Sequence, residues 1–250
     1  MEKTKKVLVY CEGKKWLVNN NLKKFSTHFG NIEIPEFKNE IETFQVNKKK
    51  FYFLKPSISE FILKIKRKTQ IIYPKDLAII LFYSDLKETD NVIETGTGSG
   101  SLLIGILSRV KKGKVITIER NQEFRKIAEK NVEDYFGKIP ENLEFIEGDV
   151  YDENFKLDFG ENWADKIFFD LPEPWKAKNL LKYLKIGGIL VNYNPQIFQI
   201  KKFIEGINGF IDINVFEILE RKWIVDEKRA RPTDIMRGHT GFIMIARRVE

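Results

Sequence analysis

The chain of 250 residues contains one cysteine, Cys11, and only two histidines. A lone cysteine excludes an intramolecular disulfide and favours a reducing, cytoplasmic location. Because the sequence lacks a cysteine and histidine cluster with zinc spacing, we expect no metal. No run of eighteen apolar residues occurs, so no membrane span is expected. The charged start from Met1 to Lys6 also lacks the apolar core of a signal peptide.

The remaining composition is that of a globular protein with an excess of positive charge. Apolar residues make up 42% and charged residues 32%, with 43 Lys and Arg against 36 Asp and Glu. The length suffices for one large domain and a small one. The net charge of +7 favours an anionic partner, with nucleic acid as the first hypothesis.

A glycine-rich turn dominates the middle of the chain. The apolar run 92–95 leads into Gly96, Gly98 and Gly100, and helical spacing follows from Ser101. Glu119 ends the next apolar run, 19 residues beyond Gly100, where a nucleoside-binding βαβ unit carries its ribose-binding carboxylate. Glycines alone fit an ordinary turn equally well. Together with the acidic residue they predict a nucleoside-containing cofactor.

From residue 91 onward, expected strands alternate with expected helices. The strands fall at 91–95, 114–118, 142–146, 166–170 and 188–193, and the helices at 99–110, 121–136, 174–184 and 195–206. Two further β-rich runs, 211–219 and 242–246, follow without helices. Five βα units and a terminal strand pair predict an α/β fold, the seven-stranded Rossmann-like sheet of class I methyltransferases.

The first 90 residues differ in pattern, so we divide the chain into 1–56, 57–90 and 91–250. Short strands are expected at 7–10, 15–18, 32–34, 41–46 and 51–54, with Glu12-Gly13 as a hairpin turn. This small β-domain is interpreted as an accessory binding module or an oligomerisation module. Ser57 and Glu60 form a capping box for a helix to Ile65, and Pro74 begins a helix to about Leu86.

Three acidic residues fall at the carboxyl ends of successive expected strands: Glu119, Asp149 and Asp170. Ligands of open α/β sheets bind at that edge. We expect Glu119 to accept hydrogen bonds from the ribose hydroxyls and Asp149 to accept one from an adenine amino group. Val150 follows Asp149 in the same turn and is expected to contact the cofactor as well.

Further cofactor contacts are expected around the glycine turn. The backbone amides of Ser99, Ser101 and Leu102 lie at the start of the expected helix. Phe124 is a candidate to cover the cofactor adenine, and a core position explains it equally well.

Several segments together resemble a known family, the tRNA (adenine-N1)-methyltransferases of the TrmI type. The most specific are Asp170-Leu171-Pro172-Glu173-Pro174-Trp175 and Glu94 to Ser101. The others are 25–30 (loosely), 54–56, 69–76, 231–232 and 238–242. In the segment 25–30, Ser26-Thr27-His28 stands where the family commonly has a His-Thr-Asp-type run.

The resemblance implies S-adenosylmethionine as methyl donor, a homotetramer, and methylation of adenine N1 in the T-loop of tRNA at position 58, in some members also 57. It also implies that Asp170 lies at the target base, with Tyr73 against the base face. Asp170 is expected to contact the methionyl amine of the donor as well. The alternative interpretation is that Tyr73 is a core residue that precedes a helix-starting proline. N1 already has an in-plane lone pair, so positioning and charge stabilisation suffice for its attack.

Two basic groups remain as candidates for RNA contact, each with a solvated surface as the alternative. One is 221–237, with Arg221, Lys222, Lys228, Arg229, Arg231 and Arg237 around Trp223; the other combines 64–68 with Lys48, Lys49 and Lys50. His239 is expected to have a structural or RNA-facing role. Two other functions stay open: a non-catalytic tRNA-binding subunit, and a methyltransferase with a small-molecule or protein-carboxyl acceptor.

Overall fold

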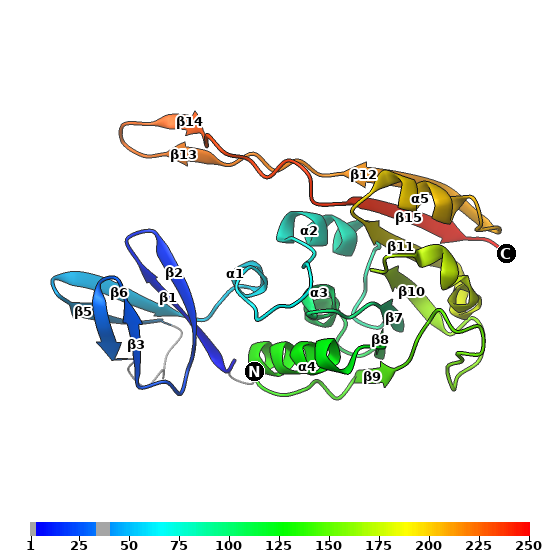
Figure 1. Ribbon diagram of the computed structural model, residues 1–250, viewed down its shortest axis with the longest axis horizontal. Coiled ribbons are helices and arrows are strands. Elements are labelled where there is room, and N and C mark those ends of the chain that lie inside the picture. The colour runs from blue at the N-terminus through cyan, green and yellow to red at the C-terminus, as the bar shows by residue number, and fades with distance from the viewer. Residues whose placement is uncertain (1–3, 34–40) are drawn as a thin grey trace.

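The computed structural model describes residues 4–33 and 41–250, in which a small β unit stands beside a larger α/β unit (Figure 1). The strand expected at 32–34 ends at Ile34, which lies outside the described residues. Within the described ranges, no helix has both the length and the apolar character needed to cross a membrane.

The β unit contains a four-stranded antiparallel sheet in the order β2-β1-β6-β5. Its strands are β1 (Lys6–Cys11), β2 (Lys14–Asn19), β5 (Ile41–Val46) and β6 (Lys49–Leu54). The turn between β1 and β2 is the predicted hairpin, because Glu12 and Gly13 both have positive φ, at 45° and 80°. A second hairpin, β3 (Lys24–Thr27) with β4 (Gly30–Glu33), includes a strand that was not predicted.

Two short helices connect the units. α1 (Ile58–Ile62) begins at the predicted capping box, in which the Ser57 hydroxyl accepts from the Glu60 amide and the Glu60 carboxylate accepts from the Ser57 amide. α2 (Pro74–Tyr83) carries Pro74 in its first turn. The predicted ends at Ile65 and Leu86 were too late by one turn.

The main sheet has seven strands in the order β12-β15-β11-β10-β7-β8-β9, which confirms the predicted fold class. The strands are β7 (Val92–Thr95), β8 (Val115–Glu119), β9 (Leu143–Glu147), β10 (Ala164–Phe169), β11 (Leu184–Asn194), β12 (Phe210–Glu217) and β15 (Phe242–Arg248). β15 runs antiparallel to both β11 and β12, and the other pairs are parallel. The strand order reverses beside β7, so a ligand crevice is expected at its carboxyl end.

Helices α3 (Ser101–Arg109), α4 (Gln122–Phe136) and α5 (Ile197–Ile204) follow β7, β8 and β11. The predicted helix at 174–184 was wrong. Two short 3₁₀ turns, η1 (Pro174–Lys176) and η2 (Lys178–Tyr183), occupy this segment. Pro172 and Pro174 have no backbone N–H to donate within a helix. The tight 3₁₀ turns between β10 and β11 instead place Leu180 and Tyr183 in the core.

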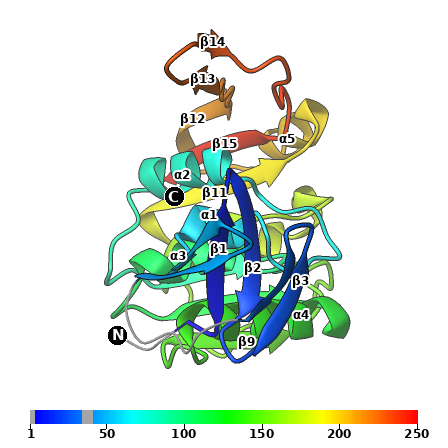
Figure 2. The same ribbon diagram turned by 90° about the vertical axis from the view of Figure 1, so that its left-hand side faces the viewer.

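A hairpin that was not predicted lies within the basic stretch 221–237. Strands β13 (Trp223–Val225) and β14 (Ala230–Pro232) form an arm that projects away from the main sheet (Figures 1 and 2). The arm thus carries much of the predicted basic stretch to the outside of the molecule.

Candidate functional site

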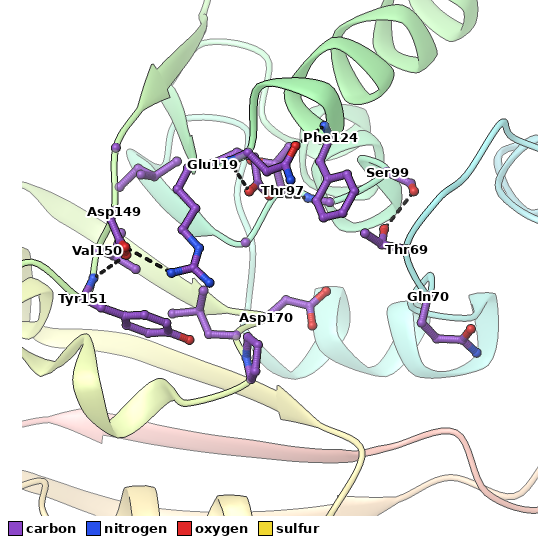
Figure 3. A pocket seen from close by; sticks show the side chains of 18 of the residues that line it. Thr69, Gln70, Thr97, Ser99, Glu119, Phe124, Asp149, Val150, Tyr151 and Asp170 are labelled. Carbon is purple, nitrogen blue, oxygen red and sulfur yellow. Dashed lines mark hydrogen bonds and ion pairs between the residues drawn. The ribbon is translucent and has the colours of Figure 1, made fainter.

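A cavity of about 320 Å³ opens at the carboxyl ends of β7, β8 and β10 (Figure 3). It lies where the order of the parallel strands reverses. Nine of the residues predicted to bind the cofactor line it: Gly96, Gly98, Ser99, Ser101, Glu119, Phe124, Asp149, Val150 and Asp170. Residues far apart in the sequence therefore meet in one place.

The glycine turn is compatible only with glycine at two positions. Gly96 has φ +81°, and a Cβ there would lie 2.1 Å from the carbonyl oxygen of Asp170. Gly98 has φ +53°, and its Cβ would lie 2.9 Å from Thr69 Oγ1. The bare backbone therefore allows the turn to approach both the end of β10 and the segment before α2, and it leaves a concave wall beside the ligand space.

Glu119 is nearly buried and already bonded to the backbone. Its Oε2 accepts from the amide of Gly98 at 3.0 Å, and its Oε1 accepts from the amide of Asn121 at 2.9 Å. Each carboxylate oxygen has a second lone pair, so capacity remains for two hydroxyl donors. This geometry suits the predicted contact with a ribose.

Asp149 is kept in its ionised form by two donors. Its oxygens accept from the Tyr151 amide and from Arg120 Nη1, each at 3.0 Å. Burial acts to raise the pKa of Asp149, but these two hydrogen bonds outweigh burial and leave the pKa below its ordinary value. The carboxylate can therefore accept a further hydrogen bond from an exocyclic amine at neutral pH.

The Asp170 side chain points into the cavity (Figure 3). Its backbone amide donates to Thr95 at 3.0 Å, which fixes the end of β10. Within residues 4–33 and 41–250, no side chain or amide donates a hydrogen bond to its carboxylate. Burial, reinforced by the nearby charge of Glu119, raises the pKa of Asp170 to about 7.

A third carboxyl group, Glu94, lies in the core beneath the turn. Its Oε2 accepts from the hydroxyl of Thr117, while its Oε1 is buried without a hydrogen-bond partner in the described structure. Burial, reinforced by the charges of Asp170 and Glu119, raises the pKa of Glu94 to about 8. At neutral pH Glu94 is therefore mostly protonated, and the negative charges of Glu119 and of ionised Asp170 make a site in which a cationic ligand is electrostatically favoured.

Three predicted residues do not line this cavity. Gly100 caps α3 with φ +81° and packs against Ala128, and the Leu102 side chain is buried in the core. Tyr73 lies at the start of α2 and lines a neighbouring cavity together with Arg237.

The cavity also contains residues that the sequence reasoning missed. Thr69 Oγ1 and Ser99 Oγ are 2.8 Å apart, and Gln70 lines the wall beside them. Tyr151 lies on the opposite side of the cavity (Figure 3). Arg120 also lines the cavity, with its guanidinium 5.4 Å from the centre of the Tyr151 ring. Thr69 and Gln70 belong to a segment that resembled the family. Nothing in the single sequence marked Tyr151.

His239 lies outside the cavity and joins two chain segments. Its Nδ1 is 2.7 Å from Glu217 Oε1, and its Nε2 is 2.6 Å from the carbonyl oxygen of Pro195. Because both partners are acceptors, both ring nitrogens must donate, and these contacts raise the pKa of His239. The imidazole therefore connects β12 to the segment before α5, as expected of a residue with a structural role.

Comparison with known proteins agrees with this geometry. The family model described as tRNA methyltransferase complex GCD14 subunit matches residues 49–239. The tRNA (adenine(57)-N(1)/adenine(58)-N(1))-methyltransferase TrmI of Methanocaldococcus jannaschii is 34% identical, over 97% of this chain and 94% of that protein. A tRNA (adenine(58)-N(1))-methyltransferase TrmI of Thermus thermophilus is 33% identical, over 78% of this chain and 75% of its own length.

Two solved structures share the whole architecture. The tRNA (m1A58) methyltransferase TrmI from Aquifex aeolicus superposes with a TM-score of 0.85 at 31% identity, covering 100% of this chain and 99% of that one. A protein from Thermotoga maritima, described as a SAM-dependent O-methyltransferase, superposes with a TM-score of 0.89 at 32% identity, covering 100% and 95%.

Proposed function

The chain belongs to the tRNA (adenine-N1)-methyltransferase family of the TrmI type, and from this premise we propose that it methylates adenine N1 in the T-loop of tRNA. The proposed target is position 58, and position 57 is included because both appear in the name of the archaeal relative. One observation carries the proposal. The Asp170 carboxylate, at the head of the family-like segment 170–175, faces a cavity that also contains the glycine turn and Glu119.

The residues of the cavity fit S-adenosylmethionine. Gly96 and Gly98 line the cavity without side chains, and the carboxyl groups around it favour a ligand that carries positive charge. In this proposal Glu119 accepts from the ribose hydroxyls, Asp149 accepts from the adenine amine, and Phe124 covers the adenine ring. S-adenosylmethionine, when bound, supplies an electrophilic methyl group.

The proposed role of Asp170 is to orient the target base and offset its charge. N1 lies on the Watson–Crick edge, so the adenine must leave its stack or pair to reach the cavity. Asp170 in its ionised form can accept from the exocyclic amine beside N1, which aligns N1 and stabilises the positive charge that develops on the ring. Tyr73 is proposed to stack on the extruded base.

The competing functions are less well supported. A non-catalytic tRNA-binding subunit would not need the intact turn with Glu119, Asp149 and Asp170 around one cavity. The description of the Thermotoga maritima protein raises O-methylation as an alternative chemistry. A small-molecule or protein-carboxyl acceptor would leave the family-like segment 170–175 without a purpose.

We also propose the functional division of the chain as 1–56, 57–90 and 91–250: an accessory tRNA-binding or oligomerisation module, linker helices, and the methyltransferase domain. A homotetramer in the cytoplasm completes the proposal. Large apolar side chains on α2, on the arm and in the segment after β14 support association, since Phe82, Val225 and Ile235 are 80%, 74% and 89% exposed. Light scattering coupled to gel filtration gives the subunit number directly.

Incubation with isotopically labelled S-adenosylmethionine and an unmodified tRNA transcript tests the activity. Digestion to nucleosides and mass spectrometry should show labelled 1-methyladenosine. Labelled 2′-O-methyladenosine would instead support O-methylation, and failure of the protein to bind the methyl donor would support the non-catalytic alternative.

A further inference from the structure

A second concave surface lies between the N-terminal sheet, α1 and α4. We name it the junction groove. It encloses about 670 Å³, and its walls carry six lysines against two carboxylates, Glu123 and Asp134. The lysines are Lys6, Lys64, Lys66, Lys68, Lys126 and Lys130. The groove therefore concentrates positive charge in a hollow, where the field of neighbouring charges adds up.

Half of these lysines are neutralised by the protein itself. Lys6 and Lys130 lie 3.2 and 3.0 Å from the two oxygens of Asp134, and Lys68 pairs with Glu123. By contrast, the exposed ammonium groups of Lys64, Lys66 and Lys126 form no ion pair in residues 4–33 and 41–250. Three uncompensated like charges in one groove repel one another, so an anionic partner would be favoured there.

The floor of the groove is connected to the cofactor cavity by buried hydrogen bonds. The side-chain amide of Asn131, on α4, donates to the carbonyl oxygen of Lys66 at 2.8 Å and to that of Ser99 at 2.9 Å. A few residues on, the amide of Ile72 donates to the hydroxyl of Ser101 at 3.1 Å. The segment 66–72 therefore runs from the lysines to the glycine turn and is fixed to it at both ends.

The walls of the groove are also fixed relative to each other. Thr4 Oγ1 and the Lys5 amide donate to the carbonyl oxygen of Asp134, at 2.8 and 2.9 Å. Lys15 of β2 forms an ion pair with Glu60 of α1 at 2.6 Å. The groove thus has a defined width and a defined path to the cavity, unlike lysines scattered over a solvated surface.

We propose that the junction groove binds the phosphate backbone of the tRNA strand that flanks the target adenine. Lys64, Lys66 and Lys126 contact phosphates, and the segment 66–72 sets their distance from the glycine turn. Lysine is a mobile point charge without a base-reading geometry, so these contacts hold the RNA in register without selecting its sequence. The inference rests on the proposed tRNA substrate and adds where that RNA lies.

The test compares two triple variants with the same loss of charge. One combines Lys64→Ala, Lys66→Ala and Lys126→Ala. The control combines Lys87→Ala, Lys112→Ala and Lys114→Ala. These lysines precede β7 and β8, do not line the junction groove, and pair with Asp85, Glu88 and Glu144. Affinity for a full-length tRNA transcript is measured by fluorescence anisotropy at several salt concentrations, and affinity for S-adenosylmethionine by calorimetry.

Each phosphate contact contributes a slope of about −0.7 to −0.9 to the dependence of log K on log salt. The groove variant should therefore show a slope shallower by about 2 to 3 and at least a tenfold weaker affinity for tRNA near 0.1 M salt. Its affinity for S-adenosylmethionine should equal that of the wild type, and the control should keep the wild-type slope.

Equal slopes for the groove variant and the wild type would overturn the proposal. An equal change in both variants would also overturn it, because net charge would then be the cause. If the groove variant loses tRNA affinity but the wild type forms no 1-methyladenosine, the groove assignment stands and the proposed activity fails.

Discussion

The guanidinium of Arg237 lies over the ring of Tyr73, 4.2 Å from its centre, and Nη1 donates to the tyrosine hydroxyl at 2.6 Å. The two residues are far apart in the sequence, and they meet because the segment after β14 returns past the start of α2. Arg237 thus covers a face of the ring that we propose for the target base. An extruded adenine stacking there must displace a cation–π contact worth about 0.5–1 kcal/mol at an exposed site.

Stacking on Tyr73 is tested by two substitutions. Tyr73→Ala removes the platform and should lower kcat/KM for tRNA by roughly 5- to 150-fold, from about 1–3 kcal/mol per stacked base. Tyr73→Phe keeps the ring and loses only the hydroxyl, with its hydrogen bonds from Arg237 and, at 3.5 Å, from Gln70, so most activity should remain. If both variants lose activity equally, the hydroxyl and not the ring face is important, and the stacking role is wrong.

The raised pKa of Asp170 predicts a pH dependence. Only the ionised carboxylate can accept from the adenine amine, and the pKa in the ligand-free protein is about 7. The value of kcat/KM should therefore rise with pH through about 7 and level off above. Asp170→Asn should lower kcat/KM by about 10²–10³ and abolish this limb. A similar limb in the variant would assign the titration to another group.

Glu119 should determine affinity for the methyl donor. Glu119→Ala removes an acceptor for two ribose hydroxyls, so calorimetry should show at least about tenfold weaker binding of S-adenosylmethionine. Glu147→Ala is the matched control, because this carboxylate ends the adjacent strand β9 outside the cavity. Unchanged affinity of the Glu119 variant would refute the ribose contact.

Glu94 should make stability depend on pH. Its pKa in the folded protein is about 8, above the ordinary value of 4.5, so folding favours the protonated form. The stability contributed by this group is complete below pH 4.5 and declines as the pH rises to about 8, because only the unfolded chain ionises in that window.

Glu94→Gln removes this dependence. The melting temperature of the variant relative to the wild type should therefore increase between pH 5 and pH 8, by on the order of 10 °C. Scanning calorimetry at both pH values measures the difference. A difference that is the same at pH 5 and pH 8 would mean that Glu94 is ionised throughout.

The sequence predicted features that local chemistry determines. Strand spacing indicated the seven-stranded sheet, and the glycines with Glu119, Asp149 and Asp170 indicated one ligand edge, because parallel strands deliver their carboxyl ends together. Features that depend on tertiary contacts were missed. Arg120 and Tyr151 line the cavity because their long side chains extend over it. The contact between Arg237 and Tyr73 joins two distant segments, and no local sequence pattern indicates it. The arm β13–β14 was not predicted, because its two short strands lie in a stretch rich in charged residues that shows no apolar strand pattern.

The central claim, transfer of a methyl group to adenine N1, is tested most directly by an atomic substitution in the RNA. A transcript with 1-deazaadenosine at position 58 lacks the proposed nucleophile but keeps the exocyclic amine, the ribose and the overall shape. Both transcripts carry a nucleoside other than adenosine at position 57, so that position 58 is the only proposed target. With labelled S-adenosylmethionine, the transcript with adenosine at position 58 should be methylated, and the transcript with 1-deazaadenosine there should take up no label. Equal labelling of both transcripts would contradict the account.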